Sequence, residues 1–296
     1  RREPRRERPQ VSRTLVTPAV EQVERLGVID VSIYRRRDGD AVGRPNLRQL
    51  LVGPHQPVPW GDPCEAPFAD RPGDARRRVL GIHANDHQVW ALSAHAQPEL
   101  TARLGGAVGQ ASERLRLLAV DASDEARVVE AIAAIVQRDG QLDILVNLIG
   151  GFAAGQPVTE LEADTFERML ALNLRPTFLL AKHAAREMAR TGWGRIVNTS
   201  SRAAWSGRRN AAAYAVAKAG VITFTEAMAE ETRPQGVTVN AILPSIIDTA
   251  ANRDAMPTAS FDRWPKPDQI ARVIAFLVSD DASLISGASI PVFGQA

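Results

Sequence analysis

The chain has 296 residues, of which 45% are hydrophobic, 24% charged and only 5% aromatic, which is enough for one or two cores and excludes a disordered or collagen-like protein. The net charge of +2 is too small to indicate a nucleic-acid partner by itself. The single cysteine, Cys64, excludes an internal disulfide and a Cys-rich zinc site, and we expect no metal.

The first ten residues, RREPRRERPQ, are charged and are followed by no apolar stretch. We therefore expect no secretory signal. No apolar run approaches the roughly 18 residues that a membrane span needs, so we expect a cytoplasmic protein without a membrane partner.

Residues 1–87 are crowded with arginine and proline and show no long periodic segment. Because proline removes an amide donor and fixes φ, the stretch from 53 to 72 cannot form a regular helix or a central strand. The arginines near the N-terminus are interspersed with Glu3, Glu7, Glu21 and Glu24 and lack aromatic interleaving, which favours a solvated tail over a nucleic-acid arm. We treat 1–87 as an atypical segment, disordered or mistranslated from another reading frame, and 88–296 as the folded domain.

Strands and helices alternate after residue 87. The sequence predicts a strand at 89–93, a helix at 98–104, a strand at 115–120, a helix capped by Ser123 and ended by Gly140, and a strand at 142–146. It then predicts a helix over 164–190 broken near Pro176, a strand at 195–198, a helix at 211–231, a strand at 237–243, a helix at 267–279 and a strand at 289–293. This alternation indicates an α/β fold with a doubly wound parallel sheet, in which ligands bind at the carboxyl ends of the strands.

Polar residues follow several of these strands. Asp121, Asn147, Ser201 and the segment 244–249 each lie where a strand ends. In this fold they would share one crevice, although polar residues follow strands in any loop.

Tyr214 and Lys218 lie four residues apart in a predicted helix and therefore share one face. A cation beside a phenol favours the phenolate, so such a tyrosine can act as a general acid or base near neutral pH. The chain has only two tyrosines and three lysines, so chance rarely produces this pair.

Ser201 lies just after a strand, where its hydroxyl can bind a substrate carbonyl. A serine hydrolase is the competing interpretation, but residues 198–202 (NTSSR) do not form the required G-x-S-x-G turn.

These features resemble the short-chain dehydrogenase/reductase family over residues 89–294. The matching segments are LDILVNLIGG (142–151), LNL around Asn173, GRIVNTSSRAAWSG (194–207), YAVAKAG (214–220) and VTVNAILPSIIDT (237–249). The resemblance implies a Rossmann-like fold, an NAD(P)(H) cofactor and hydride transfer to or from a carbonyl or secondary alcohol. It also implies a homodimer or homotetramer formed through the helices at 164–190 and 211–231.

The resemblance also implies roles for individual residues. Tyr214 would be the general acid/base, Lys218 would bind the nicotinamide ribose and lower the tyrosine pKa, Ser201 would orient the substrate, and Asn173 would support a proton-relay water. The expected cofactor contacts, besides Tyr214 and Lys218, are Asp121, Asn147, Gly150, Pro244, Ile247 and Thr249. The segments 151–155, 203–208 and 249–264 would line the substrate.

One part of the family pattern is missing. The family begins with a strand and a T-G-x-x-x-G-x-G turn that binds the pyrophosphate, and no such motif occurs before Val89. Since that strand lies mid-sheet, we expect either that the run at 49–52 replaces it or that the sheet is defective. A non-catalytic protein of the same fold, unable to bind a dinucleotide, is therefore the alternative function. No acid follows the strand at 89–93, which favours NADP(H) over NAD(H).

Overall fold

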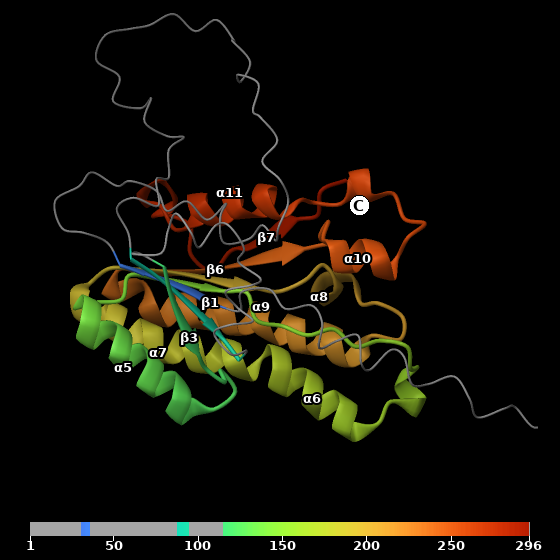
Figure 1. Cartoon of the computed structure of the whole chain (residues 1–296), viewed down its shortest axis with the longest axis horizontal. Helices are drawn as coiled ribbons and strands as arrows, with labels where there is room; N and C mark the ends of the chain where they lie inside the picture. The colour runs from blue at the N-terminus through green and yellow to red at the C-terminus, as the bar shows by residue number, and fades with distance from the viewer. Residues whose placement is uncertain (1–30, 36–87, 95–114, 296) are drawn as a thin grey trace, which may run out of the picture.

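The computed structural model describes residues 31–35, 88–94 and 115–295, which contain a seven-stranded sheet in the order β3-β2-β1-β4-β5-β6-β7 (Figure 1). The strands are β1 (Val31–Arg35), β2 (Gln88–Ser93), β3 (Leu115–Ala119), β4 (Ile144–Asn147), β5 (Gly194–Thr199), β6 (Val237–Pro244) and β7 (Ser289–Val292). The helices are α5 (Glu125–Asp139), α6 (Ala163–Asn173), α7 (Arg175–Thr191), α8 (Ala203–Ser206), α9 (Ala212–Thr232), α10 (Ala250–Ala255) and α11 (Pro267–Leu277). Short 3₁₀ turns lie at Val158–Glu160, Arg233–Gln235, Phe261–Arg263 and Asp280–Ala282.

The central strand β1 runs against its two neighbours, whereas the other adjacent strands pair in parallel. Val31 lies opposite Leu92 of β2 and Asn147 of β4, and Tyr34 lies opposite Val89 and Ile144. The start of β1 therefore lies at the edge where β2 and β4 end. The expectation that the run at 49–52 fills this gap is wrong, because residues Val31–Arg35 occupy the position between β2 and β4.

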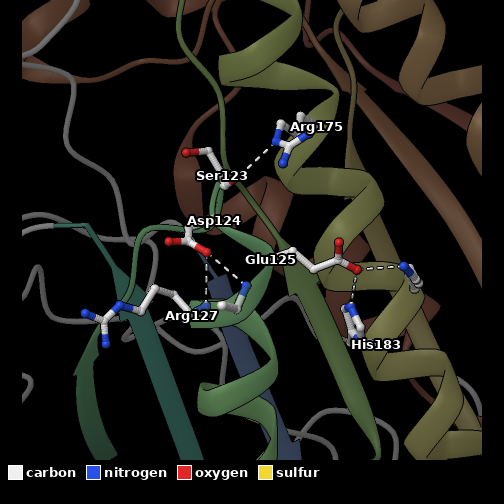
Figure 2. Close-up of polar contacts among 8 residues, drawn as sticks. Ser123, Asp124, Glu125, Arg127, Arg175 and His183 are labelled. Atoms are coloured by element: carbon white, nitrogen blue, oxygen red, sulfur yellow. Dashed lines mark hydrogen bonds and ion pairs between the residues drawn. The ribbon is translucent and has the colours of Figure 1, made fainter.

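Helix α5 begins and ends at strong capping residues. The carboxylate of Asp124 accepts hydrogen bonds from the amides of Ala126 (2.9 Å) and Arg127 (3.4 Å), as Figure 2 shows. Gly140 ends the helix in the left-handed conformation (φ 87°), which glycine adopts without steric cost. The expectation that Ser123 caps this helix is wrong by one residue. The Ser123 hydroxyl instead donates to Asp121, which leaves Asp124 in the capping position.

The long helical region near residue 174 is two helices, as Pro176 predicts. Helix α6 ends at Asn173, and α7 begins at Arg175 with the proline in its first turn, where no amide donor is needed. Two side-chain contacts then hold α7 against the start of α5. Arg175 donates to the Ser123 carbonyl (2.8 Å), and Glu125 accepts from Lys182 (2.6 Å) and pairs with His183 (2.9 Å) (Figure 2). The hydrogen bonds from Lys182 and His183 lower the pKa of Glu125 to about 2.

The helices cover both faces of the sheet (Figure 1). Helices α5, α7 and α9 pack on one face around a core that includes Leu145, Leu179 and Met188. Helix α11 packs on the other face against Val146, Val197 and Ile242. All four residues of β4 and all eight of β6 are buried, as expected of strands covered on both sides.

Two expectations fall outside the described residues, namely the helix at 98–104 and the residues after β2 that bear on cofactor choice. Within the described part of the chain, no helix is long and apolar enough to cross a membrane. The same part of the chain contains no group of three or more His, Cys, Asp or Glu side chains placed to bind a metal.

Candidate active site

The candidate residues lie where β4, β5 and β6 end and along the adjoining helix α9. Asn147 is the last residue of β4, Ser201 follows β5, and Pro244 is the last residue of β6. Tyr214 and Lys218 lie in the first two turns of α9, which packs beside β5 and β6. The parallel pairing of these strands brings their ends to one edge of the sheet.

The Lys218 ammonium is buried, with 3% of the residue exposed. Its Nζ donates to the carbonyl of Thr199 at 2.9 Å and to that of Ile149 at 3.3 Å. These bonds tie α9 to the ends of β4 and β5. Burial disfavours the charged form and lowers the pKa of Lys218 to about 8. An ammonium carries three donors, and two carbonyls in the described structure leave one for a further acceptor.

Gly150 lies against both Lys218 and Asn173. A Cβ at this position would lie 2.7 Å from Lys218 Nζ and 2.9 Å from Asn173 Oδ1, which is closer than real Cβ atoms approach. Position 150 therefore requires glycine, because any side chain there would collide with Lys218 and Asn173.

Asn173 holds the loop that follows β4. Its amide donates to the carbonyls of Gly151 and Met169, both at 3.0 Å, and its Oδ1 accepts from the Gly151 amide. Thr177 links this residue to Asn147. The Asn147 amide donates to Thr177 Oγ1 (2.9 Å), which in turn donates to the Asn173 carbonyl (2.9 Å). Both asparagines are buried, so they fix the loop at residues 149–151 beside Lys218.

Tyr214 is half-buried and packs edge-to-face against Phe152, with ring centroids 4.9 Å apart. Desolvation raises the pKa of Tyr214, and a side-chain hydrogen bond with Ser201 and the charge of Arg208 oppose the rise without cancelling it. The role of Lys218 in lowering the pKa of this tyrosine therefore stays a prediction. The ammonium is bonded to backbone carbonyls, and the burial of the phenol dominates.

Asp121 and the segment after β6 complete the predicted set. Asp121 is exposed beyond β3, and hydrogen bonds from the Ser123 hydroxyl and amide lower its pKa. After Pro244, the Ser245 hydroxyl donates to the Phe293 carbonyl (2.7 Å). Ile247 packs against the α11 core, and Thr249 caps α10 by accepting from the Asn252 amide (3.2 Å). These contacts shape the chain at the end of β6.

Two site residues were not singled out by sequence reasoning. Phe152 and Arg208 both lie in segments expected to line the substrate, but neither belongs to a motif. In the structure the Arg208 guanidinium lies 5.9 Å from the centroid of the Phe152 ring, which itself contacts Tyr214. No local sequence pattern reveals this contact, because the two loops are more than fifty residues apart.

The residues present fit one end of a nicotinamide dinucleotide. Lys218 keeps a donor for a ribose hydroxyl, and Gly150 provides the close backbone approach beside it. The pyrophosphate end does not fit the family pattern. Because β1 runs antiparallel to β2 and β4, its last residue, Arg35, lies at the edge of the sheet opposite Lys218.

Comparisons with known proteins show the family to which the chain belongs. Residues 75–294 match the family model described as enoyl-(acyl carrier protein) reductase. D-threitol dehydrogenase of Mycolicibacterium smegmatis is 34% identical over 212 residues, which cover 69% of this chain and 80% of that enzyme. A short-chain type dehydrogenase/reductase from Mycobacterium ulcerans superposes with a TM-score of 0.61 at 30% identity, covering 66% of this chain and 76% of that one. The structure of ElxO with bound NADP superposes with a TM-score of 0.66 at 28% identity, covering 71% of this chain and 88% of the ElxO chain. The chain therefore belongs to the short-chain dehydrogenase/reductase family of NAD(P)-dependent oxidoreductases.

Proposed function

We propose that the protein transfers a hydride between NAD(P)(H) and a carbonyl or secondary alcohol, with Tyr214 as general acid/base. The observation that carries this proposal is the grouping of Tyr214, Ser201 and buried Lys218 at one edge of the sheet. Asn173 and Gly150 support the group from the β4 side. Asp121, Asn147, Pro244, Ile247 and Thr249 stay predicted cofactor contacts.

The protonation states suit carbonyl reduction. The raised pKa keeps the Tyr214 phenol protonated at neutral pH, so it can donate its proton to a carbonyl oxygen. The Ser201 hydroxyl can donate a hydrogen bond to the same oxygen and orient it. A bound nicotinamide would supply or accept the hydride. In the oxidation direction Tyr214 must be a phenolate, so oxidation requires higher pH than reduction.

A non-catalytic role is the second candidate, and the direction of β1 is the observation that favours it. Strand β1 begins at the edge of the sheet where the candidate site lies, and it ends at the opposite edge. The sequence before Val89 also contains no T-G-x-x-x-G-x-G motif of the kind that binds the pyrophosphate in the family. A protein that cannot bind the dinucleotide would use the same fold for binding or assembly alone.

Three finer features belong to the proposal. NADP(H) is favoured over NAD(H) because no acidic residue follows β2 at 94–97. The partner is a small-molecule carbonyl or alcohol. The protein forms a homodimer or homotetramer through α6, α7 and α9, on which Leu172, Phe178 and Val216 are exposed.

Titration with NADPH, followed by nicotinamide fluorescence, together with a panel of ketones separates the two functions. The wild type should bind NADPH saturably and reduce at least one ketone. Tyr214→Phe should still bind NADPH but lose roughly 100-fold or more of the turnover, because it cannot transfer a proton. NADH run in parallel tests the cofactor preference.

Two results would contradict the proposal. If the folded protein binds neither NADPH nor NADH, the non-catalytic function replaces it. If reduction proceeds at the same rate in Tyr214→Phe, the assignment of the general acid is wrong even though the protein is an enzyme.

A further inference from the structure

Arg208 places a positive charge beside the candidate proton donor. Its guanidinium lies 5.9 Å from the Phe152 ring centroid, and the Phe152 ring centroid lies 4.9 Å from that of Tyr214. The guanidinium is therefore no farther from the tyrosine ring than the sum of these two distances. The charge of Arg208 acts to lower the pKa of Tyr214, against the larger effect of burial.

The backbone holds Arg208 in this place. The backbone carbonyl of Arg208 accepts a hydrogen bond from the Ala211 amide (3.1 Å). The backbone carbonyl of Asn210, two residues further on, accepts one from the Gly155 amide (2.8 Å). The second bond joins the loop at 207–210 to the loop that carries Phe152. Asn210 has a positive φ of 61°, a conformation that asparagine tolerates better than most residues. These bonds hold the backbone at Arg208 next to the loop that carries Phe152.

The guanidinium is exposed and has no carboxylate partner among the described residues. Its five donors match the two oxygens of a carboxylate. A substrate bound with its carbonyl oxygen at Tyr214 and Ser201 would extend past Phe152 toward this group. A series of oxo acids with increasing separation between the carbonyl and the carboxylate samples this gap.

We propose that Arg208 selects oxo acids, binding the carboxylate of a substrate whose carbonyl Tyr214 protonates. This inference rests on the proposed reductase function and names its substrate class. Arg208 is a binding residue in it, and Phe152 forms the apolar wall between the charge and the reacting carbonyl.

Matched acid and ester pairs test the proposal. The methyl esters of 2-oxobutanoate, 3-oxobutanoate and 4-oxopentanoate keep the ketone and remove the charge. In the wild type at least one acid should have a lower KM than its ester. In Arg208→Gln the KM of that acid should rise roughly 10- to 100-fold, with a smaller change in kcat. The change in the KM of the matching ester in the same variant measures any indirect effect through Tyr214. It should be smaller than the change in the KM of the acid.

Two further variants define the cause. Arg208→Lys keeps the charge but loses the fork of donors, so it should restore part of the acid preference. Arg209→Gln is the matched control, because Arg209 is an adjacent exposed arginine with no ring contact in the described structure. It should leave the acid preference intact.

The outcomes separate this inference from the function on which it rests. If the wild type reduces esters or neutral ketones without preferring any acid, the reductase stands and the role of Arg208 is wrong. The role is also wrong if the preference survives in Arg208→Gln or disappears equally in Arg209→Gln. If NADPH does not bind or no carbonyl is reduced, the proposed function has failed first and the inference falls with it.

Discussion

Lys218 shows what burial of a single charge does to this protein. The ammonium has its pKa lowered from 10.5 to about 8 by desolvation, and it bonds to the carbonyls of Thr199 and Ile149. An unfolded chain binds the lysine proton more tightly than the folded one between these two pH values. Folding is therefore disfavoured by this group at full strength below about pH 8, and the cost is relieved as the pH rises toward 10.5.

A comparison of the wild type with Lys218→Met tests this. The stability of the wild type relative to the variant should rise by about 2 kcal/mol between pH 7 and pH 10. Other groups that titrate in this range cancel in the difference. Urea unfolding at both pH values measures it. A difference that is constant with pH would show that the ammonium is not desolvated in the native state.

The residues of the Tyr214 helix were predictable, but their surroundings were not. The spacing of Tyr214 and Lys218 gives a shared helix face, and the structure places both at the expected sheet edge. The direction of the Tyr214 pKa depends on how deeply the phenol is buried, which no local pattern contains. The same holds for Arg208, which reaches Phe152 only because Asn210 and Gly155 join two distant loops.

Among the elements, α5 depends on the cap at its first turn. The Asp124 carboxylate accepts from the amides of Ala126 and Arg127, and α5 carries the Glu125 pairings to α7. Elements of this kind were predictable because apolar spacing and Gly140 mark their extent. The cap itself was misplaced by one residue because serine and aspartate are both favourable N-caps.

Replacing Asp124 by alanine should destabilise the protein by about 1 kcal/mol, since two amides at the helix start lose their acceptor. Asp124→Ser should retain most of the stability because its hydroxyl can also cap. Thermal unfolding compares the three proteins. Equal stability of the alanine variant would mean that solvent satisfies these amides without cost.

At the scale of the whole molecule, a helix on each face of the sheet carries a partly exposed phenylalanine. Phe178 on α7 is 42% exposed and packs edge-to-face with Phe224 of α9. Phe276 on α11, across the sheet, is 40% exposed. The proposed assembly uses the first surface, since it lies on the helices expected to meet a second copy.

Phe178→Glu should therefore shift the protein toward monomer, because a carboxylate in an apolar interface loses its hydration. Phe276→Glu is the matched control and should leave the assembly unchanged. Light scattering after size exclusion measures both variants. An unchanged assembly in Phe178→Glu would exclude the α7 surface as the contact.

The reversed strand β1 has a consequence for how the chain folds. Both of its neighbours are remote in sequence, because residues 36–87 separate it from β2 and residues 36–143 separate it from β4. Such pairings require closure of long loops before native contacts compensate for it, so we expect the middle of the sheet to form late in folding. Until β1 is in place, β2 and β4 are two open edges in the centre of the protein, each able to pair with a strand of another chain. We therefore expect slow formation of these pairings to prolong the stage at which the protein is open to aggregation.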